Sequence, residues 1–316
     1  MSSPRVSVVM AAHNAAATLP ETLASIEAQT RADFEIVVVD DGSSDATPAI
    51  LEAHAASSPR CRWVRQANAG VAAARSHAIG LARGELVAFI DADDPWLPRK
   101  LEKQLPLFDD PAVGLVYCDV RDVYPAGDAP ASWFHAKAPA RGAVLARLFA
   151  ANFVCTSSVV VRKAALLAAG GFDPRMHFNE DYDLWLRLAN EVGFDYVDEV
   201  LVRKRALASS LTHINPLECH LQDLRSIDHW VEWRPDLFPR GSALVRRRRA
   251  RALARIGYHR LQGRDFRGAR EAYWQALTLG QVDAATALRF LAALSPPLAR
   301  TAWWAKALRR RMVRPT

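Results

Sequence analysis

The stretch Glu85-Leu-Val-Ala-Phe-Ile-Asp-Ala-Asp-Asp94 decides the fold. Its first half, Leu86 to Ile90, is a run of apolar and β-favouring residues that predicts a buried strand. Three carboxylates, Asp91, Asp93 and Asp94, follow without a turn. Ligands of open α/β sheets bind at the carboxyl ends of the strands, and carboxylates gathered there favour a cation such as Mg²⁺ or Mn²⁺. A polar loop with helix-capping aspartates is the alternative for this stretch alone.

Strand-like and helix-like segments alternate before this stretch. We expect strands at 6–10, 34–39 and 61–65. We expect helices at 18–29 and 71–82, and between them a helix that ends near Ala56. Thr18-Leu-Pro-Glu21 has a capping-box pattern at the first helix. A further helix is expected at 99–108. The alternation predicts an α/β fold with a doubly wound, Rossmann-like, mostly parallel sheet that carries helices on both faces.

A second pair of acids, Asp40-Asp41, follows the second predicted strand. A carboxylate there can accept hydrogen bonds from a ribose hydroxyl or a base N–H, while Gly42 relaxes the turn and Ser43 or Ser44 caps the next helix. A plain Asp-Gly-Ser turn is the alternative. The sequence contains neither G-x-G-x-x-G after the first strand nor G-x-x-x-x-G-K-[ST], so a Rossmann dinucleotide site and a P-loop are poorly supported.

A third acidic pair, Glu180-Asp181, precedes a predicted helix. Tyr182, Trp185, Leu186 and Ala189 recur there at helical spacing and should bury one face. The two acids would sit at the helix N-terminus, where the helix dipole favours negative charge, and ordinary first-turn acids are the alternative reading.

Composition limits the class of protein. With 316 residues the chain can hold one large domain or two, and no apolar run is long enough to span a bilayer. We see no secretory signal and no C-x-x-C spacing among the four cysteines, so we expect a cytoplasmic protein with reduced thiols. From Gly241 onward 17 basic residues face three acidic ones, a net charge of +14; the first 240 residues carry 24 basic and 31 acidic residues, a net of −7.

Several motifs together resemble family 2 glycosyltransferases, which are inverting enzymes with the GT-A fold. They are the loop after the first strand, Asp40-Asp-Gly-Ser-Ser-Asp45, Asn68-Ala-Gly70 with Arg75, Gly84–Asp94, and Glu180-Asp181 before Leu184-Trp-Leu-Arg187. The likeness covers roughly residues 4 to 210. It implies a nucleotide-sugar-binding and catalytic domain at 1–215, followed by a basic α-helical region at 216–316.

The resemblance also implies roles for single residues. The nucleobase of the donor would lie at residues 11–14 and Asp40, and its ribose at Asp91. The full set of residues implied to bind the donor nucleotide is Ala11, Ala12, His13, Asn14, Asp40, Asn68, Arg75, Asp91 and Ala92. Asp93 would ligate Mn²⁺ or Mg²⁺. Asp181 would be the catalytic base, with Glu180 beside it. These residue types suit inverting transfer, because the diphosphate must be stabilised as it leaves and the acceptor hydroxyl must lose a proton.

The chain departs from the family pattern at two loops. His13 stands where a tyrosine is common, and it is either a base-binding or a solvated residue. After Val202 many relatives have a histidine, whereas this chain has Arg203-Lys-Arg205. These cations either offset diphosphate charge or are solvated.

The basic C-terminal region has its own pattern. Residues 258–277 resemble one tetratricopeptide-like helix pair, which cannot bury its face alone and should pack on the catalytic domain or on a second subunit in a homodimer. Trp303-Trp304 with Lys306 and the following arginines suggests an amphipathic helix at an anionic membrane surface, on the inner face of the cell membrane. A solvated arginine face is the alternative. We expect no nucleic acid partner.

The leading hypothesis is a metal-dependent inverting glycosyltransferase with a nucleotide-sugar donor, most simply a UDP-sugar. Its acceptor would be a hydroxyl of a glycan or lipid-linked glycan in surface polysaccharide biosynthesis. A polyprenyl-phosphate glycosyltransferase, a nucleotidyltransferase and a non-catalytic nucleotide-sugar-binding protein are the alternatives. The sequence does not reveal the sugar, the linkage or the acceptor.

Overall fold

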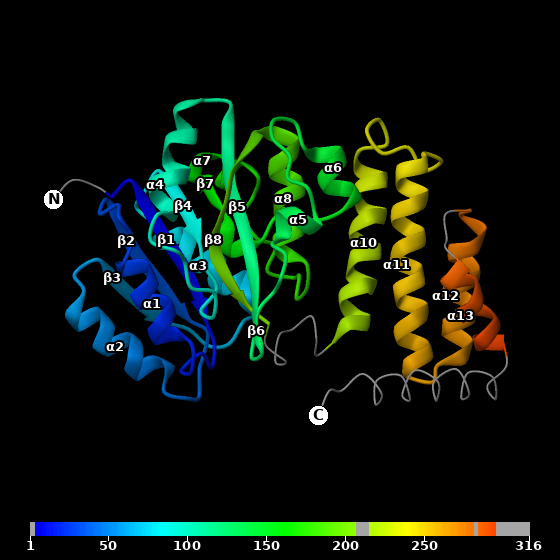
Figure 1. Ribbon diagram of the computed structural model, residues 1–316, viewed down its shortest axis with the longest axis horizontal. Helices are drawn as coiled ribbons and strands as arrows, with labels where there is room; N and C mark the ends of the chain where they lie inside the picture. The colour runs from blue at the N-terminus through cyan, green and yellow to red at the C-terminus, as the bar shows by residue number, and fades with distance from the viewer. Residues whose placement is uncertain (1–3, 207–214, 281–283, 295–316) are drawn as a thin grey trace. The chain divides into compact units, whose positions relative to one another are not determined.

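The computed structural model describes residues 4–206, 215–280 and 284–294. The chain divides into two compact units, Met1–Ala208 and Ser209–Thr316. The first contains every strand of the described residues, and the described part of the second consists of helices and their connections (Figure 1).

One mixed sheet forms the centre of the first unit. Its strands run in the order β3-β2-β1-β4-β7-β5-β6, and β8 pairs with β5. The pairs β1–β2, β2–β3, β1–β4 and β5–β8 are parallel, whereas β7 is antiparallel to both β4 and β5. The strands are β1 (Val6–Ala12), β2 (Phe34–Asp40), β3 (Cys61–Arg65), β4 (Leu86–Phe89), β5 (Val113–Tyr124), β6 (Gly127–Asp128), β7 (Val160–Arg162) and β8 (Gly193–Arg205).

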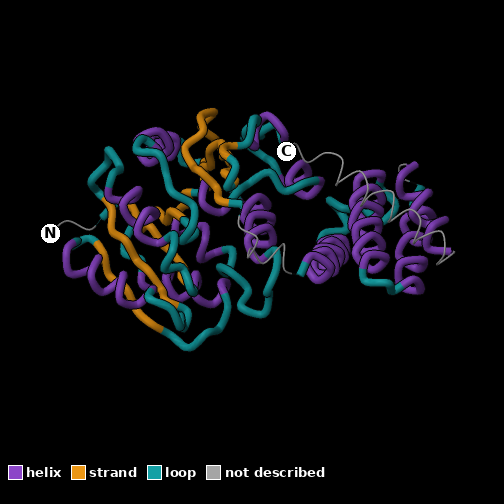
Figure 2. The backbone as a smooth tube through the Cα atoms, turned by 60° about the horizontal axis from the view of Figure 1, so that its bottom comes forward, coloured by secondary structure: helices purple, strands orange, loops and turns teal. Residues whose placement is uncertain are grey.

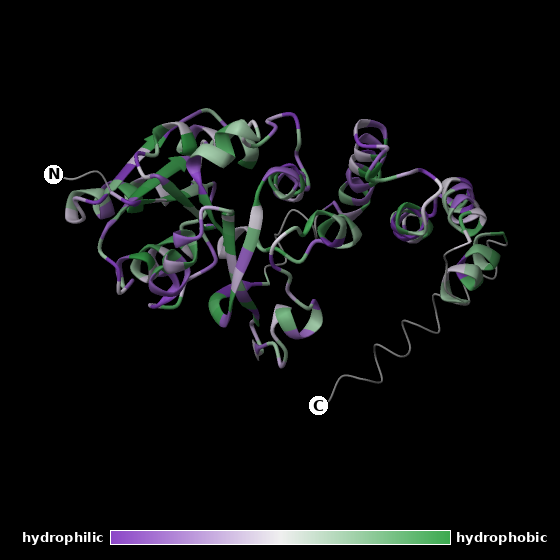
Figure 3. Cartoon of the chain, turned by 90° about the horizontal axis from the view of Figure 1, so that it is seen from above, coloured by the Kyte–Doolittle hydropathy of each residue, from purple (hydrophilic) through white to green (hydrophobic). Residues whose placement is uncertain are grey.

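Helices cover both faces of this sheet, because successive side chains of a strand point to opposite sides (Figure 2). Val8 and Ala88 belong to a core that includes Leu23 of the first helix, and Phe89, the next residue of β4, instead packs 5.7 Å from the ring of Trp185. The helices are α1 (Leu19–Glu27), α2 (Thr47–Ser57), α3 (Val71–Leu81), α4 (Lys100–Gln104), α5 (Trp133–Ala136), α6 (Leu145–Ala150), α7 (Lys163–Ala168) and α8 (Glu180–Glu191). Hydrophobic residues line several of the strands in Figure 3.

The fold class predicted from the sequence is confirmed, and four details of it are wrong. Ala11 and Ala12 continue β1 instead of forming a loop. Thr18 and Ser43 cap no helix with their side chains, since α1 begins without a side-chain cap and α2 begins after Ala46. The helix expected at 99–108 ends at Gln104 and continues as a 3₁₀ turn, η1 (Leu105–Asp109), because Pro106 has no N–H for an α-helical bond.

The second unit contains α10 (Pro216–Trp233), α11 (Ala243–Gln262), α12 (Phe266–Thr278) and α13 (Ala284–Leu294). Arg248 of α11 forms two hydrogen bonds to the Asp223 carboxylate of α10. Gly257 of α11 lies against the ring of Tyr273 of α12, so closely that an added Cβ would stand 2.9 Å from it. The predicted basic helix around Trp303 lies outside the described residues. In the described ranges no helix combines the length and the apolar character that crossing a membrane requires.

Candidate active site

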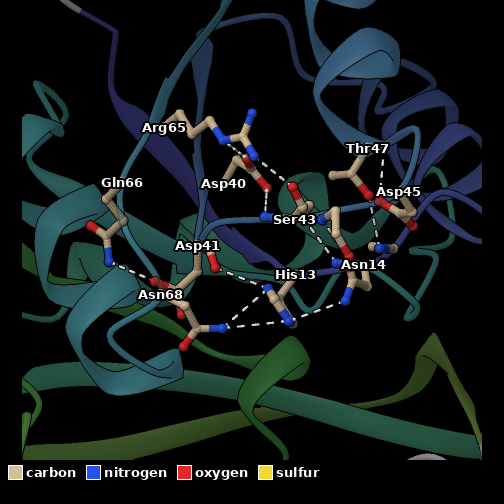
Figure 4. Close-up of polar contacts among 12 residues, drawn as sticks. His13, Asn14, Asp40, Asp41, Ser43, Asp45, Thr47, Arg65, Gln66 and Asn68 are labelled. Carbon is tan, nitrogen blue, oxygen red and sulfur yellow. Dashed lines mark hydrogen bonds and ion pairs between the residues drawn. The ribbon is translucent and has the colours of Figure 1, made fainter.

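Two loops meet at the carboxyl edge of the sheet because β1 and β2 are parallel and in register. Ala12 pairs with Asp40, so His13 and Asn14 lie beside the segment that begins at Asp41 (Figure 4). The Nδ1 of His13 donates to the carbonyl oxygen of Asp41 at 2.9 Å. That leaves Nε2 of a neutral ring as an acceptor, and the Asn14 amide nitrogen lies 3.2 Å from it. The exposed His13 side chain is therefore held in place by the neighbouring loop.

The two acids after β2 have different partners. Asp40 is fully buried; its Oδ1 accepts a bond from the Ser43 N–H, and its Oδ2 lies 3.2 Å from Nε of Arg65. Asp41 accepts three hydrogen bonds at 2.8–2.9 Å, from the N–H groups of Ala69 and Gly70 and from the Gln66 amide. Asp41 thereby fixes the turn that precedes α3.

Asn14 and Gly42 make the close approach of these loops feasible. Asn14 has a φ of 49°, a left-handed conformation that Asn tolerates, and its side-chain oxygen accepts the Ser44 N–H at 2.8 Å. Gly42 has a φ of 75°, and a Cβ there would stand 2.9 Å from the Asn68 nitrogen. Asn68 in turn points its amide nitrogen at His13, 3.4 Å from the acceptor Nε2. His13, Asn14 and Asn68 therefore meet in one loop cluster, and Ala11 and Ala12 lie in the strand that leads into it.

The acidic end of β4 is tied to two other elements. Nη2 of Arg75, from α3, donates to Asp91 Oδ1 at 2.6 Å. Asp94 is fully buried, and both of its oxygens are engaged: Oδ1 accepts from the Arg205 N–H at 3.1 Å, and Oδ2 accepts from Ser157 Oγ at 2.7 Å and from Lys204 Nζ at 3.3 Å. Asp94 thus anchors the end of β8 to this edge.

The three carboxylates of this cluster titrate differently. Burial favours the neutral acid at Asp91, but Arg75 and Lys204 outweigh it and hold the pKa of Asp91 below its ordinary value. Burial and the charge of Asp91 raise the pKa of Asp93. Burial raises the pKa of Asp94 to about 7 against the opposing charge of Lys204. Asp93 takes part in none of the ion pairs among the described residues, so its carboxylate is the one that lacks a countercharge in contact.

The third acidic pair begins α8. Glu180 is buried, and its Oε1 accepts a bond from Arg75 Nη1 at 2.7 Å. Asp181 accepts from Thr156 Oγ1 at 2.7 Å through Oδ2 and from the Tyr182 N–H at 2.7 Å through Oδ1. Arg75 therefore joins Asp91, at the end of β4, directly to the first residue of α8.

Sequence reasoning missed the residues that hold these acids. Thr156 and Ser157 belong to a short 3₁₀ turn, η2 (Thr156–Ser158), and they engage Asp181 and Asp94 respectively. The available signal is three consecutive hydroxyl residues, Thr156-Ser157-Ser158, inside an otherwise apolar, β-rich run. Lys204 was considered only as one of three cations after Val202. Its contact with Asp94 spans 110 residues, which no local pattern encodes.

A mixed sheet with acids gathered at the ends of its parallel strands is the arrangement of the GT-A fold. The chain belongs to glycosyl transferase family 2, whose family model matches residues 7–166, and it is a nucleotide-sugar-dependent glycosyltransferase. The resemblance noted in the sequence is thereby confirmed.

Relatives and solved structures agree with this assignment. An uncharacterized glycosyltransferase of Methanocaldococcus jannaschii is 30% identical over 210 residues, which are 65% of this chain and 72% of that protein. The chondroitin synthase of Escherichia coli is 28% identical over 222 residues, 68% of this chain but only 31% of the synthase. Two structures share the fold with a TM-score of 0.63: S. aureus TarS residues 1–349 in complex with UDP-GlcNAc (18% identity, 94% of this chain and 87% of that chain) and the mannosyltransferase PcManGT of Pyrobaculum calidifontis in complex with GDP-Man and Mn²⁺ (22%, 94% and 82%).

Proposed function

We propose that this enzyme transfers a sugar, with inversion, from a UDP-sugar to a hydroxyl of a glycan or lipid-linked glycan. The hyaluronan synthase of Pasteurella multocida and the E. coli chondroitin synthase, both similar to this chain over 68% of its length, support a polysaccharide acceptor. The UDP-GlcNAc complex of TarS supports the uridine donor, while the GDP-Man complex of PcManGT shows that the shared fold also serves another base.

One observation carries the proposal: Arg75 bonds both Asp91 and Glu180, at 2.6 and 2.7 Å. This bridge sets the acidic strand end beside the start of α8. A donor whose diphosphate lies at the strand end would therefore present its sugar to the N-terminal turn of that helix. Holding the two reactants in one geometry is a large part of the catalytic advantage of a transferase.

The acidic residues fit a divalent ion that arrives with the donor. No group of three His, Cys, Asp or Glu side chains is arranged as a metal cage in the part of the chain that the structure describes. Mg²⁺ and Mn²⁺ sites of nucleotide enzymes, however, use one or two carboxylates and complete the shell with phosphate oxygens and water. Asp93, which has no ion-pair partner among the described residues and whose pKa is raised by burial and by Asp91, is the carboxylate best suited to receive a cation. When bound, the ion would neutralise charge on the departing diphosphate.

Asp181 is better placed than Glu180 to serve as the general base. The Glu180 side chain is only 11% exposed and is already paired with Arg75. Asp181 is oriented by two hydrogen bonds that its carboxylate accepts, from Thr156 Oγ1 and from the Tyr182 N–H. A carboxylate held in this way can remove the proton of an acceptor hydroxyl as it attacks the sugar.

The base of the nucleotide would bind at the loop cluster of His13, Asn14 and Asn68. The ring of His13 is fixed by Asp41 and exposed on its other side, so it can stack on a base as the common tyrosine would. Asp40 is buried and paired with Arg65, so we assign it to positioning this cluster together with Asp41.

The basic helical region would bring the enzyme to an anionic membrane surface if the acceptor is lipid-linked. Arg251 and Arg255 follow one another at a spacing of four on the exposed side of α11. Like charges at this spacing destabilise an isolated helix, and anionic headgroups would relieve that repulsion. The location that we propose for the enzyme is therefore the inner face of the cell membrane.

The test is a donor panel. UDP-, GDP- and dTDP-sugars are added to the full chain with Mn²⁺, and binding is read as an increase in melting temperature, since ligands stabilise the state that binds them. Asp181→Asn should keep donor binding and lower transfer about 10²- to 10⁴-fold, as expected for loss of a general base. Asp93→Asn should weaken donor binding in Mn²⁺. Glu191→Gln, an exposed acid in the last turn of α8, is the matched control.

Two outcomes would change the proposal. No stabilisation by any donor would reject it. Unchanged transfer by Asp181→Asn, with polyprenyl phosphate as acceptor, would favour the polyprenyl-phosphate alternative, because that acceptor is already ionised and needs no base.

A further inference from the structure

Lys204 lies inside the acidic cluster at the end of β4. Its Nζ is 3.3 Å from Oδ2 of the fully buried Asp94, and a third of its side chain, 33%, remains exposed. An ammonium has three N–H donors, and Asp94 accepts one of them. The cation is therefore anchored from one side and can contact an anion from the other.

The register of β8 fixes this position. The Leu97 N–H donates to the Leu201 carbonyl at 2.9 Å, and the Arg203 N–H donates to the Pro95 carbonyl at 3.0 Å. Because side chains alternate along a strand, Arg203 points away and pairs with Asp128, whereas Lys204 points into the cluster. The contact follows from backbone pairing and does not depend on a flexible side chain alone.

Lys204 and Arg75 neutralise much of the charge of the cluster. Arg75 pairs with Asp91 and Lys204 with Asp94, so of three carboxylates only Asp93 lacks an ion-pair partner among the described residues. Burial works against the charge of Lys204, but Cys155 and the three aspartates raise its pKa well above its ordinary value, so it stays protonated at neutral pH. A cluster with this balance attracts a free divalent ion less than three bare carboxylates would.

We propose that Lys204 is a built-in cation of the donor site that contacts the diphosphate directly. The inference rests on the function proposed above. Lys204 would supply part of the positive charge that a divalent ion would otherwise supply alone. Donor binding would then persist, weakened, after the metal is removed, and Mn²⁺ would bind weakly until a diphosphate is present.

The experiment compares nucleotide binding with and without metal. UDP, GDP and dTDP are titrated into the full-length protein by calorimetry, once in Mn²⁺ and once in EDTA. The variants are Lys204→Gln, the charge-conserving Lys204→Arg, and Lys103→Gln, a control in which a lysine paired with Glu199 is changed. We expect the wild type and the control to bind in EDTA, Lys204→Gln to bind at least about tenfold more weakly there, and Lys204→Arg to retain most of the affinity.

A second measurement does not involve the nucleotide. Titration of Mn²⁺ into the protein alone, followed by electron paramagnetic resonance, should show tighter binding by Lys204→Gln than by the wild type. If the wild type binds a nucleotide in Mn²⁺ but not in EDTA, or if Lys204→Gln matches it in EDTA, the inference is wrong and the proposed function stands. If the wild type binds no nucleotide under either condition, both are wrong.

Discussion

Replacing Arg75 by methionine removes the side chain that bonds both Asp91, just after β4, and Glu180, the first residue of α8. The guanidinium is 7% exposed and bonds Asp91 and Glu180, whose side chains are 28% and 11% exposed. Loss of one partner of a buried ion pair costs about 3–5 kcal/mol, because the remaining charge stays desolvated. We expect a loss in free energy of unfolding of about 3 kcal/mol, the lower end of that range, since Asp91 keeps partial contact with water.

The assay must report on the first unit alone, because a chain with two units need not unfold in one step. Hydrogen exchange of the β4 and α8 amides, followed by mass spectrometry across a urea series, provides such a readout. The double variant Arg75→Met with Glu180→Gln should lose less free energy of unfolding than the two single variants lose in sum, since each change removes the same interaction. Lysine at position 75 should recover only part of the loss, because it cannot bond two carboxylates as a planar fork does.

The pH dependence has a definite sign. Burial raises the pKa of Glu180, while Arg75 opposes that rise, so removing Arg75 raises this pKa further. A carboxyl group with a raised folded-state pKa is most stabilising when protonated, and it loses that contribution as the pH rises through its pKa. The difference in free energy of unfolding between wild type and Arg75→Met should therefore shrink as the pH falls from 7 to 5. Unchanged exchange rates in β4 and α8, with only nucleotide binding lost, would refute this reasoning and make Arg75 a nucleotide contact.

Three further changes test other parts of the structure. Thr156→Val should lower kcat of transfer about tenfold, less than the 10²- to 10⁴-fold expected for loss of the base itself, with little change in donor KM; an equal loss of donor affinity would speak against orientation of the base. Lys100→Met should stabilise the protein at pH 7 in urea unfolding, because Lys100 is fully buried and burial lowers its pKa to about 8; this gain should shrink as the pH rises above 8, and a constant gain would contradict it. Gly257→Ala should destabilise the helical unit by roughly 1–3 kcal/mol through overpacking against the Tyr273 ring, whereas Gly241→Ala, at an open position, should not; calorimetry would show whether the two differ.

The sequence predicted those features of the fold that depend on local pattern. The apolar runs of β1, β2 and β4 and the helical spacing of Tyr182, Trp185, Leu186 and Ala189 all correspond to buried positions. The antiparallel placement of β7 was not predictable, because an apolar strand buried on both faces has the same pattern in either direction.

The partners of the acidic residues could not be predicted for a related reason. Arg75 bonds Asp91 and Glu180 across 16 and 105 residues, and nothing local to Arg75 distinguishes it from a nucleotide contact. Asp40 and Asp41 look equivalent in the sequence, yet one pairs with Arg65 and the other fixes the turn before α3. Such assignments depend on tertiary packing, which the order of residues along the chain does not show.

The bonds from Asp41 to the turn before α3 also bear on how a donor would bind. Ala69, Gly70 and Gln66 are held by this one carboxylate, and His13 is held by its backbone carbonyl. Loops that are held by the protein's own hydrogen bonds spare a ligand the entropic cost of ordering them. The nucleobase should accordingly bind to these loops rapidly and without rearranging them. The enzyme should discriminate between bases because a base of the wrong shape does not fit a rigid surface.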